Sequence, residues 1–497
     1  MSTPRVRFAP SPTGYFHVGS ARTCLFNWLF ARQQGGTFVL RIEDTDAERN
    51  RDEWLAGIIS AMSWLGMSPD EGPYLQSERS SRYQAAIEAL WQGGFLYACD
   101  CTREVVDERT KGNATPGYDG LCRDRGLERG PGRALRFRTP DLGETVVADV
   151  IRGDVSFPHR AMEDFVCVKS SGHPLFVLAN VVDDRDMGIT HVIRGEDLLP
   201  TTPKGILLWQ ALDGTAAEPD GVAGDRGGPL PLPVFAHLPM LVNEQRKKLS
   251  KRKDPVAVES YRDQGYLPEA FRNYLALLGW SPPGDAEMVE LEVLVREFRL
   301  EDVHHAPAFF DVRKLTHMNG EYIRRLPLKD FVRACRPWVC PSEDQWSPEG
   351  AGRAWPVERF DEAKFEFLAP LVQERVAVLG EVPGMVDFVF LADPPFDQAS
   401  WDKAIGRDAG SRAILGAAVE AYGSCGWTAG VLHEVTLALA EAQGRKLGKA
   451  QAPIRVAVTG RSVGPPLFES LQVLGRDEVL RRLRRAIEEA GVAGDAG

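Results

Sequence analysis

The stretch RVRFAPSPTGYFHVGSART (residues 5–23) decides the fold of this 497-residue chain. Apolar and charged residues alternate over positions 5–9, as in a short strand. A turn punctuated by proline and glycine follows at residues 10–14, and the apolar spacing then predicts an amphipathic helix from Gly19. Residues 38–42 form a second apolar strand. Strand, turn, helix and strand in this order predict a parallel α/β sheet whose ligands bind at the carboxyl ends of its strands.

The overall composition is that of a globular protein, with 43% hydrophobic and 26% charged residues. The length exceeds what one hydrophobic core supports, so several domains are expected. The net charge of −11 does not exclude nucleic acid, because phosphate binding needs only a local basic surface. No apolar run approaches the roughly 20 residues of a membrane span, and the eight cysteines are too few for a disulfide scaffold. These features predict a cytoplasmic protein that does not enter a membrane.

Later parts of the chain differ in pattern. Residues 82–177 contain a cysteine cluster and short strand-like runs, which we interpret as an insertion into the sheet domain. Residues 181–199 return to apolar strand and loop. Residues 213–233 are rich in Gly, Pro, Ala and Asp and form an unusually long loop. Helical periodicity prevails from residue 254 onward.

The first candidate catalytic motif is PSPTGYFHVG (residues 10–19). The N-terminus of the predicted helix offers N–H groups and a partial positive charge to a phosphate, and Gly19 allows close approach to the backbone. His17 can donate a hydrogen bond to a phosphate oxygen whose charge grows in the transition state. His-x-Gly alone is found in many ordinary loops; its place between a strand and a helix favours the functional interpretation.

The second motif is the basic segment KKLSKRK (residues 247–253). Lysines on a loop can close over a triphosphate and stabilise departing pyrophosphate. An isolated charge run is more often a solvated loop, so this segment indicates phosphate binding only in combination with the first motif.

Together the two motifs resemble the paired signatures of class I aminoacyl-tRNA synthetases. Further stretches resemble the glutamyl-tRNA synthetase family in the same order along almost the whole chain. They are RIEDTD (residues 41–46), LANVVDD (178–184), HVIRGEDLL (191–199), the segment 248–280 that begins with KLSKR, FDVRKLTHMNGEYIRRL (310–326) and IRVAVTGRSVGPPLFESLQVLG (454–475).

The resemblance implies a Rossmann-like catalytic domain with an inserted α+β acceptor-binding domain, followed by helical stem-contact and anticodon-binding domains. The implied boundaries are 1–81 and 178–236 for the catalytic domain, with the KLSKR loop at 248–252, then 82–177 for the insertion, 237–312 for the stem-contact domain and 313–497 for the anticodon-binding domain.

The resemblance also implies the reaction. Glutamate would first react with ATP, accompanied by Mg²⁺, to give glutamyl-adenylate, and the glutamyl group would then pass to the terminal ribose of tRNA(Glu). The implied catalytic residues are His17, Gly19, Lys248 and Lys251, with Lys251 nearest the pyrophosphate. The implied ATP contacts are Pro10, Ser11, Gly14, His17, Gly19, Lys248, Ser250 and Lys251. A monomer is the state usual in the family.

The two carboxylates and one ammonium of L-glutamate call for two cations and one anion. Arg7 and Arg194 match the family's carboxylate-binding arginines, whose planar forks suit a carboxylate, and Glu43 matches the acceptor of the ammonium. The remaining implied contacts are Ala9, Ser11, Phe176 and Asn180. Phe176 departs from the family, which usually has tyrosine there, and the lost hydroxyl predicts weaker glutamate binding.

The cysteine cluster consists of Cys99, Cys101 and Cys122, with Tyr118 close by in sequence. Two cysteines at i, i+2 and a third about twenty residues on can converge on a tetrahedral Zn²⁺ ion. The spacing C-x-C…Y-x-x-x-C resembles the zinc site of shortened relatives of the family. The alternative is a set of reduced thiols without metal.

Several other functions remain open at this point. A shortened paralogue that glutamylates a modified tRNA base would lack the helical C-terminal half, and a glutaminyl-tRNA synthetase would end in β-barrels. An enzyme that charges both tRNA(Glu) and tRNA(Gln) is a further alternative. A repurposed, non-charging relative is disfavoured because His17, Gly19, Lys248 and Lys251 are all present.

Overall fold

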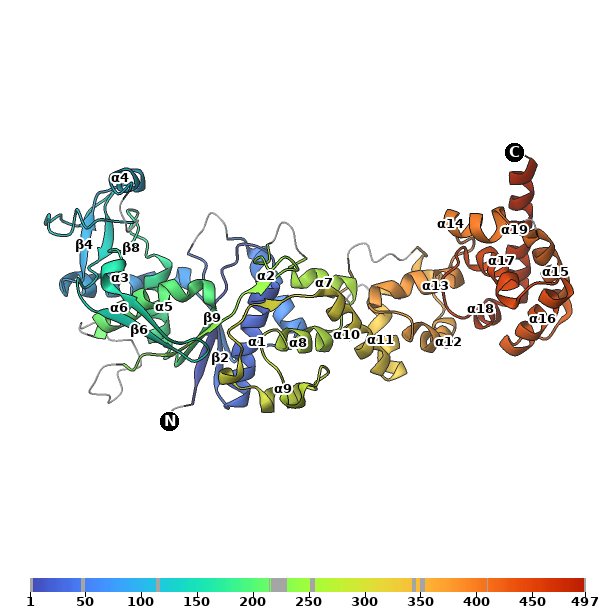
Figure 1. Cartoon of the computed structure of the whole chain (residues 1–497), viewed down its shortest axis with the longest axis horizontal. Coiled ribbons are helices and arrows are strands. Elements are labelled where there is room, and N and C mark those ends of the chain that lie inside the picture. Colours follow the sequence, from blue (N-terminus) through green and yellow to red (C-terminus); the bar gives the residue numbers. More distant parts are fainter. Residues whose placement is uncertain are drawn as a thin grey trace. The chain divides into compact units, whose positions relative to one another are not determined.

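The computed structural model describes residues 3–45, 50–112, 117–213, 215, 230–250, 255–341, 346–348, 354–408 and 410–495. The chain divides into two compact units (Figure 1). The first unit comprises Met1–Glu259 and Phe271–Val312, and the second comprises Ser260–Ala270 and Arg313–Gly497. In the described residues no helix is both long and apolar enough to cross a membrane.

The predicted strand–helix–strand opening is confirmed. It consists of β1 (Arg5–Phe8), α1 (Val18–Gln33) and β2 (Thr37–Ile42), and β1 pairs with β2 in parallel. The sheet has seven strands in the order β3-β2-β1-β9-β10-β6-β7. Because β1 lies between β2 and β9 (His191–Gly195), the strand order reverses there. A crevice at the carboxyl ends of such strands is where α/β sheets bind ligands.

Two strands of this sheet come from the segment that the sequence predicted to be an insertion. β6 (Glu144–Asp149) pairs in parallel with β10 (Val234–Leu238), and β7 (Gly153–Pro158) follows β6 in an antiparallel hairpin. The far edge of the sheet is β3 (Glu71–Leu75). The pairing of β6 with β10 joins segments far apart in sequence, so no local sequence pattern predicts it.

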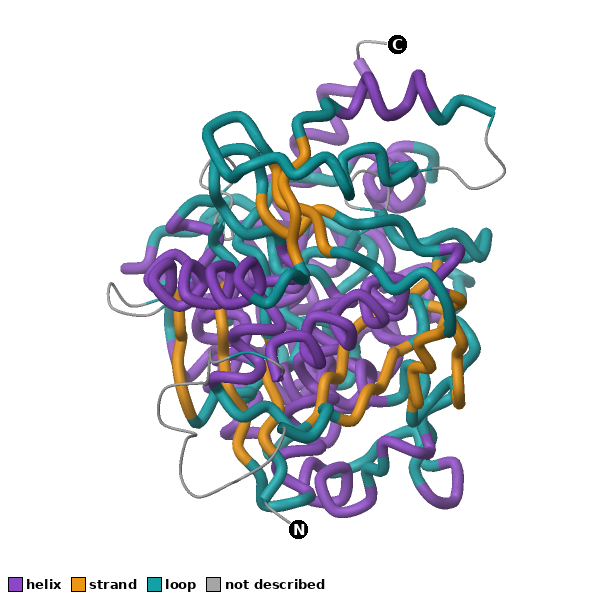
Figure 2. Tube along the Cα trace, turned by 90° about the vertical axis from the view of Figure 1, so that its left-hand side faces the viewer, coloured by secondary structure: helices purple, strands orange, loops and turns teal. Residues whose placement is uncertain are grey.

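A separate antiparallel sheet of three strands has the order β4-β5-β8, with β4 (Leu96–Cys99), β5 (Ala134–Phe137) and β8 (Val166–Val168). Figure 2 shows these strands apart from those of the main sheet. They share a hydrophobic core with α3 (Ser80–Gln92), α5 (Phe176–Asp186) and α6 (Thr202–Asp213).

The other elements of residues 50–312 are short. They are α2 (Asp52–Trp64), α4 (Arg103–Arg109), β11 (Leu241–Val242), α7 (Val258–Gln264), α8 (Pro268–Ala276), α9 (Leu291–Glu297) and β12 (Ala308–Phe309). The predicted loop at residues 213–233 lies mostly outside the described residues.

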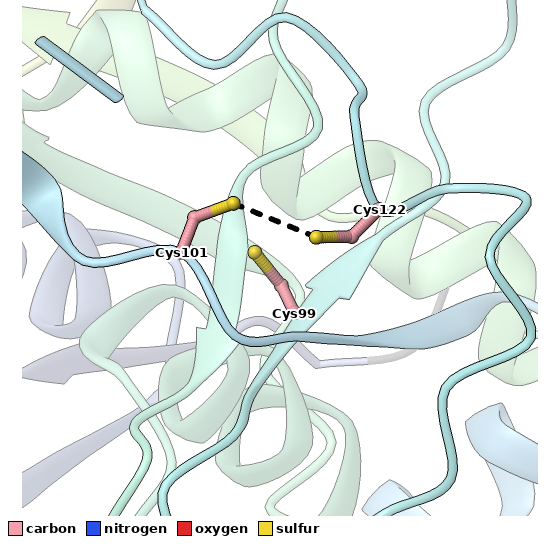
Figure 3. A group of neighbouring side chains, drawn as sticks. All are labelled: Cys99, Cys101 and Cys122. Carbon is pink, nitrogen blue, oxygen red and sulfur yellow. Dashed lines mark hydrogen bonds between the residues drawn. The ribbon is translucent and has the colours of Figure 1, made fainter. Parts of the chain in front are cut away.

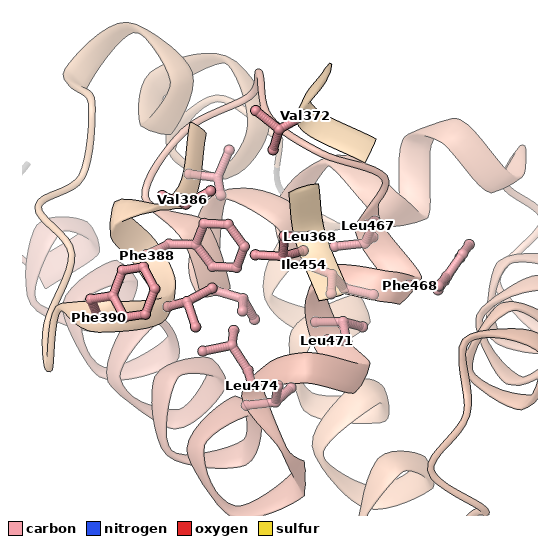
Figure 4. Close-up of a cluster of buried hydrophobic side chains, with 14 of the residues drawn as sticks. Leu368, Val372, Val386, Phe388, Phe390, Ile454, Leu467, Phe468, Leu471 and Leu474 are labelled. Carbon is pink, nitrogen blue, oxygen red and sulfur yellow. The ribbon is translucent and has the colours of Figure 1, made fainter. Parts of the chain in front are cut away.

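The C-terminal half is helical, as its periodicity predicts. Its apolar faces form one extended core, part of which is seen in Figure 4, where α12 and α13 meet α17 and α18. The helices are α10 (Val312–Arg325), α11 (Leu328–Val339), α12 (Glu362–Gln373), α13 (Val382–Phe390), α14 (Gln398–Trp401), α15 (Ser411–Ser424), α16 (Ala429–Ala442), α17 (Leu447–Thr459), α18 (Leu467–Leu474) and α19 (Arg476–Asp495).

Candidate active site

One cavity of 610 Å³ lies at the carboxyl ends of the central strands. Its walls come from the ends of β1, β2 and β9, the turn before α1, the start of α5 and the segment after β11. The predicted site residues that line it are Arg7, Ala9, Pro10, Ser11, Gly14, His17, Gly19, Glu43, Phe176, Asn180, Arg194 and Lys248. Residues separated by up to 241 positions in sequence, Arg7 and Lys248, therefore line one cavity.

His17 is the N-cap of α1, and its Nδ1 accepts a hydrogen bond from the amide of Gly19 at 2.9 Å. A side chain at Gly19 would place its Cβ 3.2 Å from that nitrogen, so glycine leaves this contact uncrowded. Because Nδ1 is the acceptor, the neutral ring carries its proton on Nε2. This tautomer suits donation of a hydrogen bond to a phosphate oxygen.

The N-terminus of α1 offers fewer N–H groups than the sequence suggested. The amide of Gly19 is bonded to His17, and the amide of Val18 donates to the carbonyl of Val256 at 2.8 Å. The amide of Val258 in turn donates to the carbonyl of Phe16 at 2.9 Å. The chain just after the KLSKR segment is therefore joined to the His-x-Gly motif by backbone hydrogen bonds.

Lys248 lines the cavity and pairs with Asp197, another lining residue, at 3.0 Å. Both side chains are more than half exposed, so this ion pair contributes little to stability. A triphosphate would offer Lys248 a stronger partner than a single carboxylate. Ser250 lies beyond the residues that line the cavity, and Lys251 is outside the described residues.

Arg7 belongs to a buried ion network rather than standing alone. Its Nε and Nη2 bond the two oxygens of Asp184 at 3.0 and 3.3 Å. Asp184 also accepts from Arg41 at 2.7 Å, and Arg41 reaches Asn180 at 2.6 Å. Burial opposes ionisation of Asp184, but the two arginines outweigh it and hold the pKa of this carboxyl below its usual value. Nε and Nη2 of Arg7 are thus occupied, and its Nη1 has no hydrogen-bond partner among the described residues.

Glu43 follows β2 directly and is buried at the cavity wall. Burial raises the pKa of this carboxyl, against the opposing effects of Arg41, Asn180 and Arg7. The hydroxyl of Ser11 lies 3.5 Å from Oε2 of Glu43. A positively charged ligand group at this position would stabilise the ionised form of this carboxyl.

Arg194 lines the cavity and makes no ion pair in the part of the chain that the structure describes. Among the described residues no carboxylate lies within ion-pair distance of it, and its contacts are with Leu198, Thr201, Thr202 and His237. Burial lowers the pKa of Arg194 to about 10, an effect that Arg7 reinforces. A half-buried guanidinium without an anionic partner favours an anionic ligand in the cavity that it lines.

Phe176 begins α5 and lies one turn before Asn180, whose amide nitrogen donates to the carbonyl of Phe176 at 3.2 Å. Both residues line the main cavity and a smaller neighbouring one of 40 Å³. The smaller cavity also borders Arg194 and Thr202. The cavities beside the ring of residue 176 therefore contain polar groups, although most of the residues that line the smaller one are apolar.

The predicted cysteine cluster is brought together. The sulfurs of Cys99, Cys101 and Cys122 all lie within 4.8 Å of one another and point toward a common centre (Figure 3). The shortest separation, 3.5 Å, joins Cys101 and Cys122. A tetrahedral zinc ion with Zn–S bonds of 2.3 Å would place its sulfurs about 3.8 Å apart. The thiol positions therefore fit such an ion.

Basic side chains surround the cluster. Nε of Arg136 lies 3.3 Å from Sγ of Cys99, and Nη1 of Arg125 lies 3.3 Å from Sγ of Cys122. The hydroxyl oxygen of Tyr118 accepts from the amide of Cys122 at 2.6 Å, and its ring lies under the guanidinium of Arg136 at 3.7 Å. Guanidinium donors favour thiolates, which is the form that binds metal.

Several residues of the site were not singled out from the sequence. Arg41 and Asp184 were quoted only inside longer motifs, although a charged residue in an apolar strand and an acidic pair in a helix are both recognisable signals. Arg22 was also missed. It is buried, lines the cavity, and donates to the carbonyls of Pro239 and, at 3.1 Å, Leu278.

The fold agrees with comparisons to known proteins. Residues 4–317 match the model of the class I tRNA synthetase catalytic domain (E and Q), and residues 330–487 match an anticodon binding domain. This chain belongs to the class I tRNA synthetases of that group.

Its most similar relatives include glutamate–tRNA ligases. The one from Frankia casuarinae is 56% identical over 97% of this chain and 98% of its own length, and the one from Salinispora arenicola is 54% identical over 97% and 99%. Among solved structures, a glutamate tRNA ligase from Elizabethkingia meningosepticum in complex with its amino acid aligns with a TM-score of 0.79 at 30% identity. That alignment covers 98% of this chain and 99% of the other. The resemblance to glutamyl-tRNA synthetases is confirmed.

Proposed function

We propose that this chain joins L-glutamate to tRNA(Glu) with consumption of ATP. The observation that carries the proposal is the position of Arg194, a half-buried cation without a carboxylate partner in the described residues, which lines the same cavity as Glu43 and His17. One cavity is thus lined by a group that can bind a carboxylate, a group that can bind an ammonium and a group that can bind phosphate. The glutamate–tRNA ligases to which the chain is similar act on such a set of substrates.

Glutamate binds with its ammonium at Glu43 and its carboxylates at Arg194 and at the Nη1 edge of Arg7. Ser11 and Asn180 contact the same ligand, and Ala9 and Phe176 shape the wall. Glutamate carries one net negative charge, which neutralises Arg194. Glutamine is neutral overall and would leave Arg194 or Arg7 without an anion, which is a large penalty in a buried site.

ATP binds beside glutamate, along the turn that contains Pro10, Ser11 and Gly14. His17 donates to a phosphate oxygen through Nε2, and Lys248 exchanges Asp197 for the phosphates. Ser250 and Lys251 contact the pyrophosphate portion. Mg²⁺ accompanies ATP and neutralises part of the phosphate charge.

The reaction then follows from position and charge. An oxygen of the α-carboxylate attacks the α-phosphorus, the bond to the bridging oxygen of the β-phosphate breaks, and pyrophosphate leaves with that electron pair. Glutamyl-adenylate remains. The terminal ribose hydroxyl of tRNA next attacks the activated carbonyl, loses its proton, and displaces AMP. No side chain forms a covalent bond, so the contribution of the protein is orientation and charge stabilisation.

We also propose a structural Zn²⁺ ion held by Cys99, Cys101 and Cys122, with the oxygen of Tyr118 as the fourth ligand. When bound, the ion braces the chain around β4 and has no chemical role. The thiol spacing and the three neighbouring arginines, Arg109, Arg125 and Arg136, support this proposal.

The parts of the chain take separate roles with tRNA. Residues 82–177 hold the acceptor end, residues 237–312 contact the stem, and residues 313–497 bind the anticodon. Residues 1–81 and 178–236, with the loop 248–252, form the catalytic domain. The enzyme acts as a monomer in the cytoplasm, where tRNA is charged.

The test is charging of unfractionated tRNA with radiolabelled glutamate and, in parallel, glutamine. We expect glutamyl-tRNA only, with strongly reduced rates for Lys251→Ala and Lys248→Ala and substantial activity for Lys248→Arg, which keeps the charge. Charging of tRNA(Gln) with glutamate would identify the enzyme that serves both tRNAs. Absence of charging by folded, ATP-binding protein would contradict the proposal.

A further inference from the structure

A row of buried polar side chains lies behind Arg194, across three adjacent strands. His237 on β10 is the direct register partner of Arg194 on β9, and Asp149 ends the next strand, β6. The side chains of Asp149 and His237 are both fully buried and lie 2.6 Å apart, between Oδ2 and Nδ1. Nε2 of His237 lies 2.9 Å from the hydroxyl of Thr202 and 3.4 Å from Nε of Arg194. Nη2 of Arg194 donates to the same hydroxyl at 2.8 Å.

Asp149 is held in its ionised form by four donors. Its Oδ1 accepts from the amides of Ile151 and Arg152 at 3.0 and 2.9 Å, and its Oδ2 accepts from the amide and Nδ1 of His237. Burial opposes ionisation, but these hydrogen bonds outweigh it and hold the pKa of Asp149 below its usual value. A carboxylate that only accepts requires a proton on Nδ1 of His237.

This requirement fixes the tautomer of His237. Burial lowers the pKa of His237, the cations Arg194 and Arg152 lower it further, and Asp149 opposes them. The ring is therefore neutral near pH 7, with Nδ1 protonated and Nε2 an acceptor. Nε2 then accepts from the Thr202 hydroxyl and faces Nε–H of Arg194, and the Thr202 oxygen accepts from Nη2. A proton on Nε2 would instead point at the Nε–H of Arg194.

We propose that Asp149, His237 and Thr202 form a positioning relay for Arg194, which orients its guanidinium so that Nη1 faces the substrate cavity. Nη1 has no hydrogen-bond partner among the described residues. Within the relay, Nε2 of His237 faces Nε of the guanidinium, and the Thr202 hydroxyl accepts from Nη2. It rests on the proposed function, in which Arg194 binds a carboxylate of glutamate. Its members touch no substrate, so they are positioning residues.

A purely structural role for the same side chains would give a different outcome. In that case His237 would serve only to join β10 to Asp149, and its Nε2 would be dispensable. His237→Asn separates the two roles, because an asparagine amide can still donate to Asp149 but has no atom where Nε2 was. Thr202→Val removes the hydroxyl with little change of shape, and Thr202→Ser keeps it.

The experiment measures KM for glutamate and for ATP separately, by glutamate-dependent ATP–pyrophosphate exchange with tRNA present. We expect His237→Asn and Thr202→Val to raise the glutamate KM about tenfold, as for loss of a hydrogen bond to a charged group. The ATP KM and the thermal midpoint should stay near wild-type values, and Thr202→Ser should behave like wild type. Thr202→Val decides the matter alone if His237→Asn does not fold.

The outcomes separate the relay from the function on which it rests. If Arg194→Gln raises the glutamate KM but His237→Asn and Thr202→Val do not, the relay is overturned and the proposed site stands. Equal increases in the glutamate and ATP KM would also overturn the relay. If wild type does not activate glutamate, or Arg194→Gln leaves its KM unchanged, the proposed function fails and the relay fails with it.

Discussion

Replacing Arg194 with glutamine should raise the stability of the protein and lower the affinity of the protein for glutamate. Burial lowers the pKa of Arg194 to about 10, which corresponds to about 3 kcal/mol of destabilisation of the charged form in the folded enzyme. The arginine is charged at pH 7 in the folded and the unfolded chain, so the folded state alone bears this cost. Glutamine removes the charge and can still donate to Thr202.

Two effects of opposite sign follow. The free energy of unfolding should rise by about 1–2 kcal/mol, since part of the gain is offset by lost hydrogen bonds. The glutamate KM should rise about 100-fold or more, because removing one partner of a buried ion pair costs roughly 3–5 kcal/mol. Urea unfolding without ligands measures the first effect. Glutamate-dependent ATP–pyrophosphate exchange with tRNA measures the second.

Arg5 provides a matched control. It lies on β1 with Arg7 but pairs with Glu71 at 2.8 Å and does not line the cavity. Arg5→Gln should leave the glutamate KM unchanged and lower stability by no more than about 1 kcal/mol. A less stable Arg194→Gln protein with an unchanged glutamate KM would refute this reasoning, since it would make Arg194 a structural residue.

Three other substitutions test the site. Phe176→Tyr should lower the glutamate KM about 2- to 10-fold by restoring a hydroxyl, and an unchanged KM would show that the hydroxyl finds no partner. Cys101→Ser should lower both the zinc content of purified protein and its thermal midpoint, whereas Cys425→Ser, outside the cluster, should change neither; zinc-free wild type would contradict the site. Asp184→Asn should destabilise the fold by about 3–5 kcal/mol at pH 7, because it leaves two buried arginines short of an anion. The pKa of Asp184 is depressed in the folded state, so its contribution to stability is present above the usual carboxyl pKa of about 3.9 and is lost as pH falls below it. Unfolding curves from pH 7 to pH 3 should therefore converge for wild type and variant, and a constant difference would contradict the assignment.

Local patterns were enough to predict the elements that begin and end at clear signals. β1, α1 and β2 follow from alternation, from the turn before Gly19 and from the paired glycines after α1. The C-terminal helices follow from their apolar spacing. These features depend on neighbours in sequence, which is why the sequence alone contains them.

Other features depend on contacts between distant segments. β6 joins the main sheet only because β10 lies there to pair with it, and Asp149 consequently reaches His237. Arg7 matches a substrate-binding position in sequence, yet Asp184 occupies its fork in the folded chain. The amide of Gly19 is used by His17 and not left for phosphate. Each of these depends on which groups tertiary structure brings within hydrogen-bond distance.

Backbone hydrogen bonds join residues 16–18 to residues 256–258, so the chain between them leaves this place in the fold and returns to it. Lengthening a surface loop within that chain is inexpensive, since doubling a flexible loop costs only about 0.6 kcal/mol of closure entropy. Such insertions leave the His-x-Gly motif joined to the chain after the KLSKR segment, whereas the strands in between, which position Glu43 and Arg194, must be kept.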